Sequence, residues 1–72
     1  PPSESPVRVR LAVYDAAGRL VRVLVDENQA GGSREAVWNG VDSAGRGVAS
    51  GIYFSVLEAG KQRRTQKMVL LK

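Results

Sequence analysis

The residues best suited to bind a ligand stand in a glycine-rich stretch near the middle of the chain. Asn39, Asp42 and Ser43 carry side-chain oxygens, and the glycines around them would let backbone carbonyls converge on a cation such as Ca²⁺. A calcium site takes about six to eight oxygens and usually several carboxylates, whereas this stretch holds only the carboxylate of Asp42. The composition therefore favours a turn that Asp42 caps through its side chain, and we predict no metal site.

The same stretch lacks the features of a phosphate-binding loop. It contains no Gly-Lys-Ser or Gly-Lys-Thr sequence, and no helical pattern follows it to direct backbone N–H groups at a phosphate. The chain has no His and no Cys, which removes the usual general base and the commonest zinc ligands. Several carboxylates are scattered without a pairing that suggests acid and base roles; they are Glu4, Asp26, Glu27, Glu35 and Glu58. We predict that the chain is not an enzyme and has no cofactor.

The aromatic side chains offer one further candidate site, a platform for a sugar ring. The chain has one Trp, two Tyr and one Phe, so packing in a core is the simpler explanation for them. Trp38 is expected to be the largest packing unit of that core. Carbohydrate binding by an accessory module, through Trp38 or Tyr53, is kept as an alternative.

Length and composition limit the chain to one small domain. Its 72 residues are 43% hydrophobic, which suffices for one thin core and is too apolar for a disordered tail. The apolar runs are far shorter than the roughly 20 residues that cross a bilayer, so we expect no transmembrane segment. The net charge is +4, but the cations mostly alternate with apolar residues, as on solvated strand faces. We therefore expect no nucleic-acid partner.

Apolar residues recur with the two-residue period of strands, and no helical period is sustained. Residues 1–6 are predicted to be a linker or strand lead-in because they are rich in proline. The run 20–25 is apolar on both faces apart from Arg22, which predicts a strand that is covered on both sides or bulged midway. Five strands are predicted, with hairpins joining the first two and the last two; they span 7–15, 20–26, 33–38, 52–58 and 62–71.

Two segments of five residues share the same turn chemistry. The sequences Asp-Ala-Ala-Gly-Arg at 15–19 and Asp-Ser-Ala-Gly-Arg at 42–46 both begin with Asp and place Gly fourth. We predict that Asp15 and Asp42 accept hydrogen bonds through their carboxylates, and that the glycines supply a positive φ. Five residues are too few to establish an internal repeat, so the likeness indicates a shared turn type.

A series of short motifs extends over nearly the whole domain. In order, they are the hairpin of residues 9–24, Ala30-Gly31-Gly32, Val37-Trp38-Asn39-Gly40 with Asp42 and Gly45, Val48-Ala49-Ser50-Gly51-Ile52-Tyr53-Phe54, and Gln66-Lys67-Met68-Val69-Leu70-Leu71-Lys72. Each motif alone is weak. Their combined order and spacing resembles the C-terminal sorting domains of the bacterial type IX secretion family, and the Ig-like domain of the flagellar hook-capping protein shares the pattern.

The resemblance implies an all-β fold, a small Ig-like β-sandwich of about five strands over residues 7–72, without catalysis. It implies a module at the C-terminus of a secreted or cell-surface bacterial protein. The strand that the secretion machinery would read, or that would serve assembly, comprises Lys67, Met68, Val69, Leu70, Leu71 and Lys72. The structural turn and core positions are Asp15, Gly18, Trp38, Gly40, Asp42, Gly45, Gly51 and Tyr53. The hook-capping relatives imply instead a structural subunit of an extracellular assembly.

One departure from the family pattern concerns the start of the domain. Family members typically carry another strand before the first one here, and residues 1–6 are too short and too rich in proline to supply it. The inward aliphatic side chains of such a strand would contribute about 5–9 kcal/mol, comparable to the whole stability of a small domain. We therefore expect the sandwich to be completed by the rest of a longer chain, or by strand addition from a neighbouring subunit in a homo-oligomer or filament.

Overall fold

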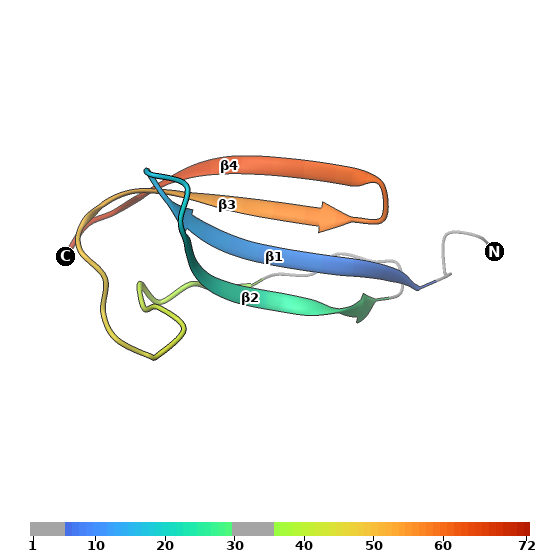
Figure 1. The fold of residues 1–72 in the computed structure, drawn as a ribbon, viewed down its shortest axis with the longest axis horizontal. Helices are drawn as coiled ribbons and strands as arrows, with labels where there is room; N and C mark the ends of the chain where they lie inside the picture. The colour runs from blue at the N-terminus through green and yellow to red at the C-terminus, as the bar shows by residue number, and fades with distance from the viewer. Residues whose placement is uncertain (1–5, 30–35) are drawn as a thin grey trace.

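The computed structural model describes residues 6–29 and 36–72, and these residues form an all-β fold. Four strands pair in one antiparallel sheet with the order β2-β1-β3-β4 (Figure 1). Their bounds are Val7–Asp15 for β1, Leu20–Gln29 for β2, Gly51–Ala59 for β3 and Gln62–Leu70 for β4. The predicted all-β class and both hairpins are confirmed. The described residues include no helix long and apolar enough to cross a membrane.

The predicted strand at 33–38 is not a strand where the structure describes it. Residues 33–35 lie outside the described residues, as do 1–5 of the predicted lead-in and the glycine motif at 30–32. Residues 36–38 pair with no strand, and the side chain of Val37 is 78% exposed. Trp38 is held instead by its indole N–H, which donates to the carbonyl of Val41 at 2.8 Å. The described residues thus form a single sheet, consistent with part of a small Ig-like sandwich.

Alternate residues of each strand lie on opposite faces of the sheet, which we name after an aromatic residue on each. The ladder pairs odd-numbered residues of β1 with odd-numbered residues of β3, so the odd-numbered side chains of both strands lie on the same face of the sheet. The Trp38 face carries Leu11, Val13, Tyr53, Leu57 and Met68. The Tyr14 face carries Ala12, Tyr14, Phe54, Val56 and Thr65.

β2 departs from regular pairing at two points. Its ladder with β1 passes over Leu24 and, further toward the turn, over Val21. Each omission is a β-bulge, in which one extra residue lies in one strand of the pair. Of the two interpretations of this apolar run, the structure supports the bulged strand. Because the first bulge shifts the alternation, Leu24 reaches the Trp38 face.

Both faces of β1 are covered at the centre of the sheet. Ala12 and Val13 are neighbours in sequence that point to opposite faces, and both are fully shielded from solvent. Alternation places Ala12 on the same face as Arg8 and Arg10. It is buried there because Arg10 donates a hydrogen bond to the hydroxyl of Tyr14 at 3.0 Å, and these side chains flank it on the same face. Among the described hydrophobic residues the buried ones are Ala12, Val13, Tyr53 and Val56.

Replacing the central valine tests how much of the stability comes from this core. We expect Val13→Ala to lower the free energy of unfolding by about 2 kcal/mol, because it removes buried methyl groups and leaves a cavity. The same substitution at exposed Val37 should change it by less than about 0.5 kcal/mol. Urea denaturation followed by circular dichroism measures both. Equal losses in the two variants would show that the core lies elsewhere.

Candidate functional site

The two five-residue turns at 15–19 and 42–46 have the same geometry. Asp15 Oδ1 accepts the backbone N–H groups of Ala17 at 3.0 Å and Arg19 at 2.9 Å. Asp42 Oδ1 accepts those of Ala44 and Arg46 at 2.9 and 3.0 Å. The glycines that close the turns have φ of 86° and 82°, a region that residues with a Cβ rarely adopt. In each turn, the Asp carboxylate thus accepts hydrogen bonds from backbone N–H groups that would otherwise lack a partner in the protein.

The Asp42 turn is attached to the sheet rather than open to a cation. The backbone N–H of Ser43 donates to Val21 O at 3.1 Å, and Arg22 Nη1 donates to Asp42 O at 2.7 Å. The second carboxylate oxygen of Asp42 lies 3.7 Å from Arg46 Nε. The only described carboxylate of the glycine-rich stretch is therefore engaged within its own turn, which supports turn capping over calcium binding. In the sequence, the residue that could have indicated this attachment of the turn to the sheet is Arg22, the one charged residue in the apolar run 20–25.

Both turn carboxylates have a pKa below the ordinary value. For Asp15, the hydrogen bond from the backbone of Arg19 is the main cause of the lowered pKa, and the side chain of Arg19 adds to it. For Asp42, the backbone of Arg46 contributes most, followed among the lowering causes by the backbone of Ala44. Hydrogen bonds to the charged form favour ionisation, so the folded chain holds these protons less tightly than the unfolded chain.

This difference predicts a loss of stability in acid. Because the unfolded chain binds these protons more tightly, acidification favours unfolding: the contribution is fully present above about pH 5 and is lost as the pH falls through 3.8 to the lower folded-state pKa values. In the double variant Asp15→Asn, Asp42→Asn, the urea midpoint should depend less on pH between about 5 and 2. An unchanged slope would contradict the assignment.

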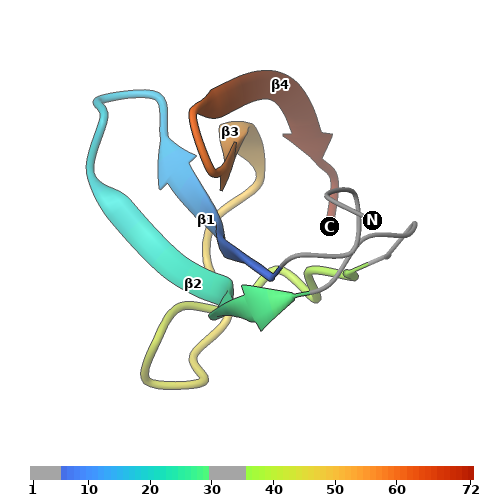
Figure 2. The ribbon, with the colours of Figure 1, turned by 90° about the vertical axis from the view of Figure 1, so that its right-hand side faces the viewer.

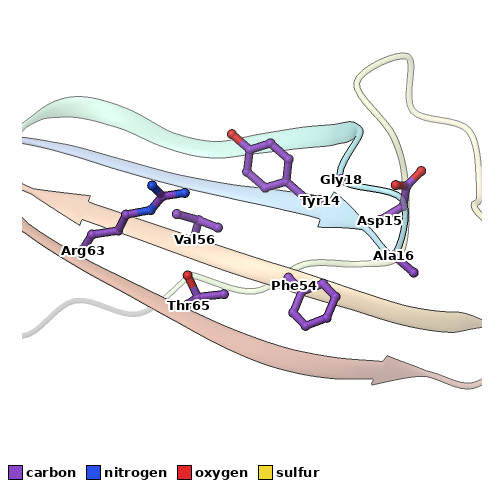
Figure 3. A pocket seen from close by; sticks show the side chains of 8 residues that line it. All are labelled: Tyr14, Asp15, Ala16, Gly18, Phe54, Val56, Arg63 and Thr65. Carbon is purple, nitrogen blue, oxygen red and sulfur yellow. The ribbon is translucent and has the colours of Figure 1, made fainter.

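The aromatic residues divide between the two faces and form no common platform. Trp38 and Tyr53 meet edge to face, with ring centroids 4.9 Å apart. Tyr53 is only 7% exposed, and its hydroxyl donates to Ala49 O at 2.6 Å. Tyr14 and Phe54 lie on the other face, beside a pocket of about 370 Å³ (Figure 3). Trp38 and Tyr53 therefore act as a clamp that holds residues 41–49 against β3, which weakens the sugar-binding alternative.

Removing one hydroxyl tests this clamp. We expect Tyr53→Phe to lower the free energy of unfolding by about 1 kcal/mol, because it removes the hydrogen bond to Ala49. Tyr14→Phe, the matched control, loses an acceptor for Arg10 on a more exposed side chain and should cost less. Thermal unfolding followed by Trp38 fluorescence measures both. If added glycans shifted the Trp38 emission, carbohydrate binding would return as the better explanation.

An apolar groove lies on the Trp38 face, and we call it the Trp38 groove. Its volume is about 380 Å³, and all four strands contribute side chains to it. The side chains that matter here are Leu11, Leu24, Trp38, Leu57, Arg64 and Met68. None of the four strand residues Leu11, Leu24, Leu57 and Met68 reaches full burial. A sandwich buries one face of each sheet against a second sheet, and the apolar groove favours the Trp38 face for that role.

The predicted sorting or assembly strand is divided by the structure. Lys67, Met68, Val69 and Leu70 belong to β4, and the last two residues of the chain follow it. Met68 and Leu70 are half-buried, whereas Val69 and Leu71 are 61% and 83% exposed. One side of the strand is therefore packed and the other is free.

The end of this strand is anchored to the loop before β3. Leu70 pairs with Gly51, and a Cβ on Gly40 would lie only 3.3 Å from the Leu70 methyl groups. The backbone N–H of Lys72 donates to Ser50 Oγ at 3.0 Å. Gly40 also has a positive φ of 73°, so the close approach and the backbone both require glycine at this position. The sequence-predicted residues Gly40, Gly51, Trp38 and Tyr53 are thus brought together around the end of β4.

The comparisons with known proteins identify one family. A family model described as FlgD Ig-like domain matches residues 2–63. No curated protein and no solved structure gives a match. The matched range covers β1, β2 and β3 and ends just inside β4. It supports the hook-capping half of the resemblance, while the type IX sorting half stays a prediction.

Proposed function

We propose that this chain, which belongs to the FlgD Ig-like domain family, acts as a sorting or attachment module of a secreted or cell-surface bacterial protein. The family and the all-β sheet support a structural, non-catalytic role. The observation that carries the proposal is the Trp38 groove, an apolar surface whose burial against another segment would be favourable. On this proposal, the module joins a larger protein to a partner in secretion or at the cell surface.

The described carboxylates support a structural role because each has a partner in a turn or within the sheet. Asp15 and Asp42 cap turns. Asp26 accepts a hydrogen bond from Arg8 at 2.6 Å, and Glu58 Oε1 lies 3.8 Å from Arg10 Nη1. Glu27 accepts one from the side-chain amide of Gln29 at 3.3 Å. None of these pairs presents two carboxylates to one substrate, as acid and base catalysis on a sugar would require.

The Trp38 groove supports completion by an added segment. Half-buried leucines on a sheet face gain stability when another layer covers them, about 1 kcal/mol for each side chain, which is roughly half of the gain for a fully exposed one. For a domain with a core this small, such a gain is a large fraction of the total stability. The covering segment comes from the rest of a longer protein or from a neighbouring subunit, by addition of a strand.

The last strand supports a role in recognition by a secretion machinery. Met68 and Leu70 hold it to the Trp38 face, while Val69 and Leu71 remain exposed between Lys67 and Lys72. An apolar strand face flanked by cations is available to a partner without any unfolding of the sheet. We place the sorting signal in this exposed half of residues 67–72.

A secretion assay tests the sorting role. A reporter protein carrying this chain at its C-terminus should reach the surface or medium of a bacterium that has a type IX system. Val69→Glu should reduce export by about tenfold, because a charge placed in an apolar contact costs about 1–3 kcal/mol. Val37→Glu, at a similarly exposed valine outside the strand, should leave export unchanged.

The outcomes of this assay separate the sorting role from the structural one. Circular dichroism shows whether each variant is folded. If the folded fusion were not exported, or if both glutamate variants were exported equally well, the sorting role would be wrong. The assignment to the FlgD Ig-like domain family would still stand.

A further inference from the structure

Four side chains that lie side by side across the sheet alternate in charge. Asp26 of β2 pairs with Arg10 of β1, Arg10 pairs with Glu58 of β3, and Glu58 pairs with Arg63 of β4. All four lie on the Tyr14 face, at one level of the sheet, and we call them the charge row. Within the row, Arg10 Nη1 and Glu58 Oε1 are 3.8 Å apart. Opposite charges on directly paired strand residues stabilise the pairing.

The charge row ends in opposite charges at the two edges of the described sheet. Its acidic end, Asp26, is on β2, and its basic end, Arg63, is on β4. Figure 2 shows these two strands at opposite sides of the sheet. An edge strand presents backbone N–H and C=O groups that can pair with another chain. The two edges therefore complement each other in charge and in backbone chemistry.

We propose that a second copy of this chain adds its β2 to β4 of the first, with Asp26 of one copy opposite Arg63 of the other. β2 runs antiparallel to β1, and β4 runs in the same direction as β1. A copy added beside the sheet, with the same face up and turned only by the twist of the sheet, thus brings its β2 antiparallel to β4. The charge row then continues from one copy into the next with its signs still alternating.

The same register creates a second favourable pair on the Trp38 face. Glu27 is level with Gln62, because the ladders join Glu27 to Val9, Val9 to Ala59 and Ala59 to Gln62. In the next copy, Glu27 would lie diagonally across from Arg64, which is two residues beyond Gln62 on β4. Diagonal neighbours are within reach of long side chains. Both faces of the new strand pair therefore carry an opposite-charge contact.

The alternative edge pairings are disfavoured. β4 carries Arg63, Arg64 and Lys67 and no acidic residue, so two β4 strands would repel each other. Two β2 strands would bring Asp26 and Glu27 of each copy together. The Ser43 hydroxyl and backbone N–H both donate to Val21 O of β2, at 3.2 and 3.1 Å, so the proposed contact uses the part of β2 around Asp26 and Glu27, away from Val21.

The pairing of β2 with β4 is heterologous, since it joins two different surfaces. Each added copy therefore leaves one free edge of each kind, and growth continues beyond a dimer. The contact centres on Arg63, whereas the proposed sorting signal lies toward the other end of β4 at residues 67–72 and the Trp38 groove lies on a face of the sheet, so failure of the self-association leaves the proposed sorting role untouched.

Charge exchange at the row tests the proposal. Sedimentation velocity of the intact chain in dilute salt should show association that rises with concentration beyond the dimer and weakens in about 0.5 M salt, because salt screens the pair. Arg63→Glu and Asp26→Lys should each weaken association by about tenfold, since each sets like charges opposite each other. An equimolar mixture of the two variants should recover it. In alternating copies, the introduced carboxylate of one variant meets the introduced ammonium of the other, and the native Arg63 and Asp26 meet at the next contact.

Lys67→Glu is the matched control for Arg63→Glu. It makes the same change in net charge on the same face of β4, but its row runs through Phe54 and Tyr14 to Leu20 and contains no acid. It should change association by less than about twofold. Asp26→Asn replaces Asp26→Lys if circular dichroism shows the lysine variant to be unfolded, and it should still weaken association.

Three results would overturn the proposal. The first is a chain that stays monomeric at every concentration. The second is a loss with Lys67→Glu as large as with Arg63→Glu, which would indicate an effect of net charge alone. The third is a dimer that does not grow and does not respond to Asp26, which would indicate pairing through the Trp38 groove or between two β4 strands.

Discussion

The ladder between β1 and β3 is the interaction on which the rest of the structure depends. Each strand belongs to its own hairpin, and within the described residues this ladder is what joins the two hairpins into one sheet. Its centre is also where the chain is best buried, at Ala12 and Val13 on β1 and Val56 on β3. A shift of one residue in this register would exchange the faces of a whole hairpin relative to the other. The Trp38 groove and the charge row both require the observed register.

Residues 36–50, the described part of the loop between β2 and β3, are held mainly by side-chain hydrogen bonds rather than by strand pairing. Trp38 and Tyr53 donate to carbonyls of this loop, and Arg22 holds Asp42 against β2. Because Leu70 packs on Gly40, the same loop fixes the end of β4. Changes in the loop therefore reach the strand that we assign to recognition, through contacts rather than through the chain.

The sheet offers two surfaces to partners, and their physics differs. The Trp38 groove is apolar, so it gains from any well-fitting cover and has little preference for direction. The charge row is polar and periodic, so it adds little energy but selects one register and one pair of edges. A structural module can use the Trp38 groove to complete its core and the charge row to select which strand edges pair, and in which register.

The sequence alone determined the local features of this chain. The hairpins follow from alternating apolar residues, and the two turns follow from Asp and Gly at fixed positions, because each of these depends on neighbours within a few residues. The sequence also placed a strand at residues 33–38, where alternation continues but no ladder partner is found for 36–38. Alternation places Ala12 on the same face as Arg8 and Arg10, but it does not encode the hydrogen bond between Arg10 and Tyr14 that spans this position. Only the tertiary structure decided that Asp26, Arg10, Glu58 and Arg63 stand in one row, because that row depends on the register between strands far apart in the chain.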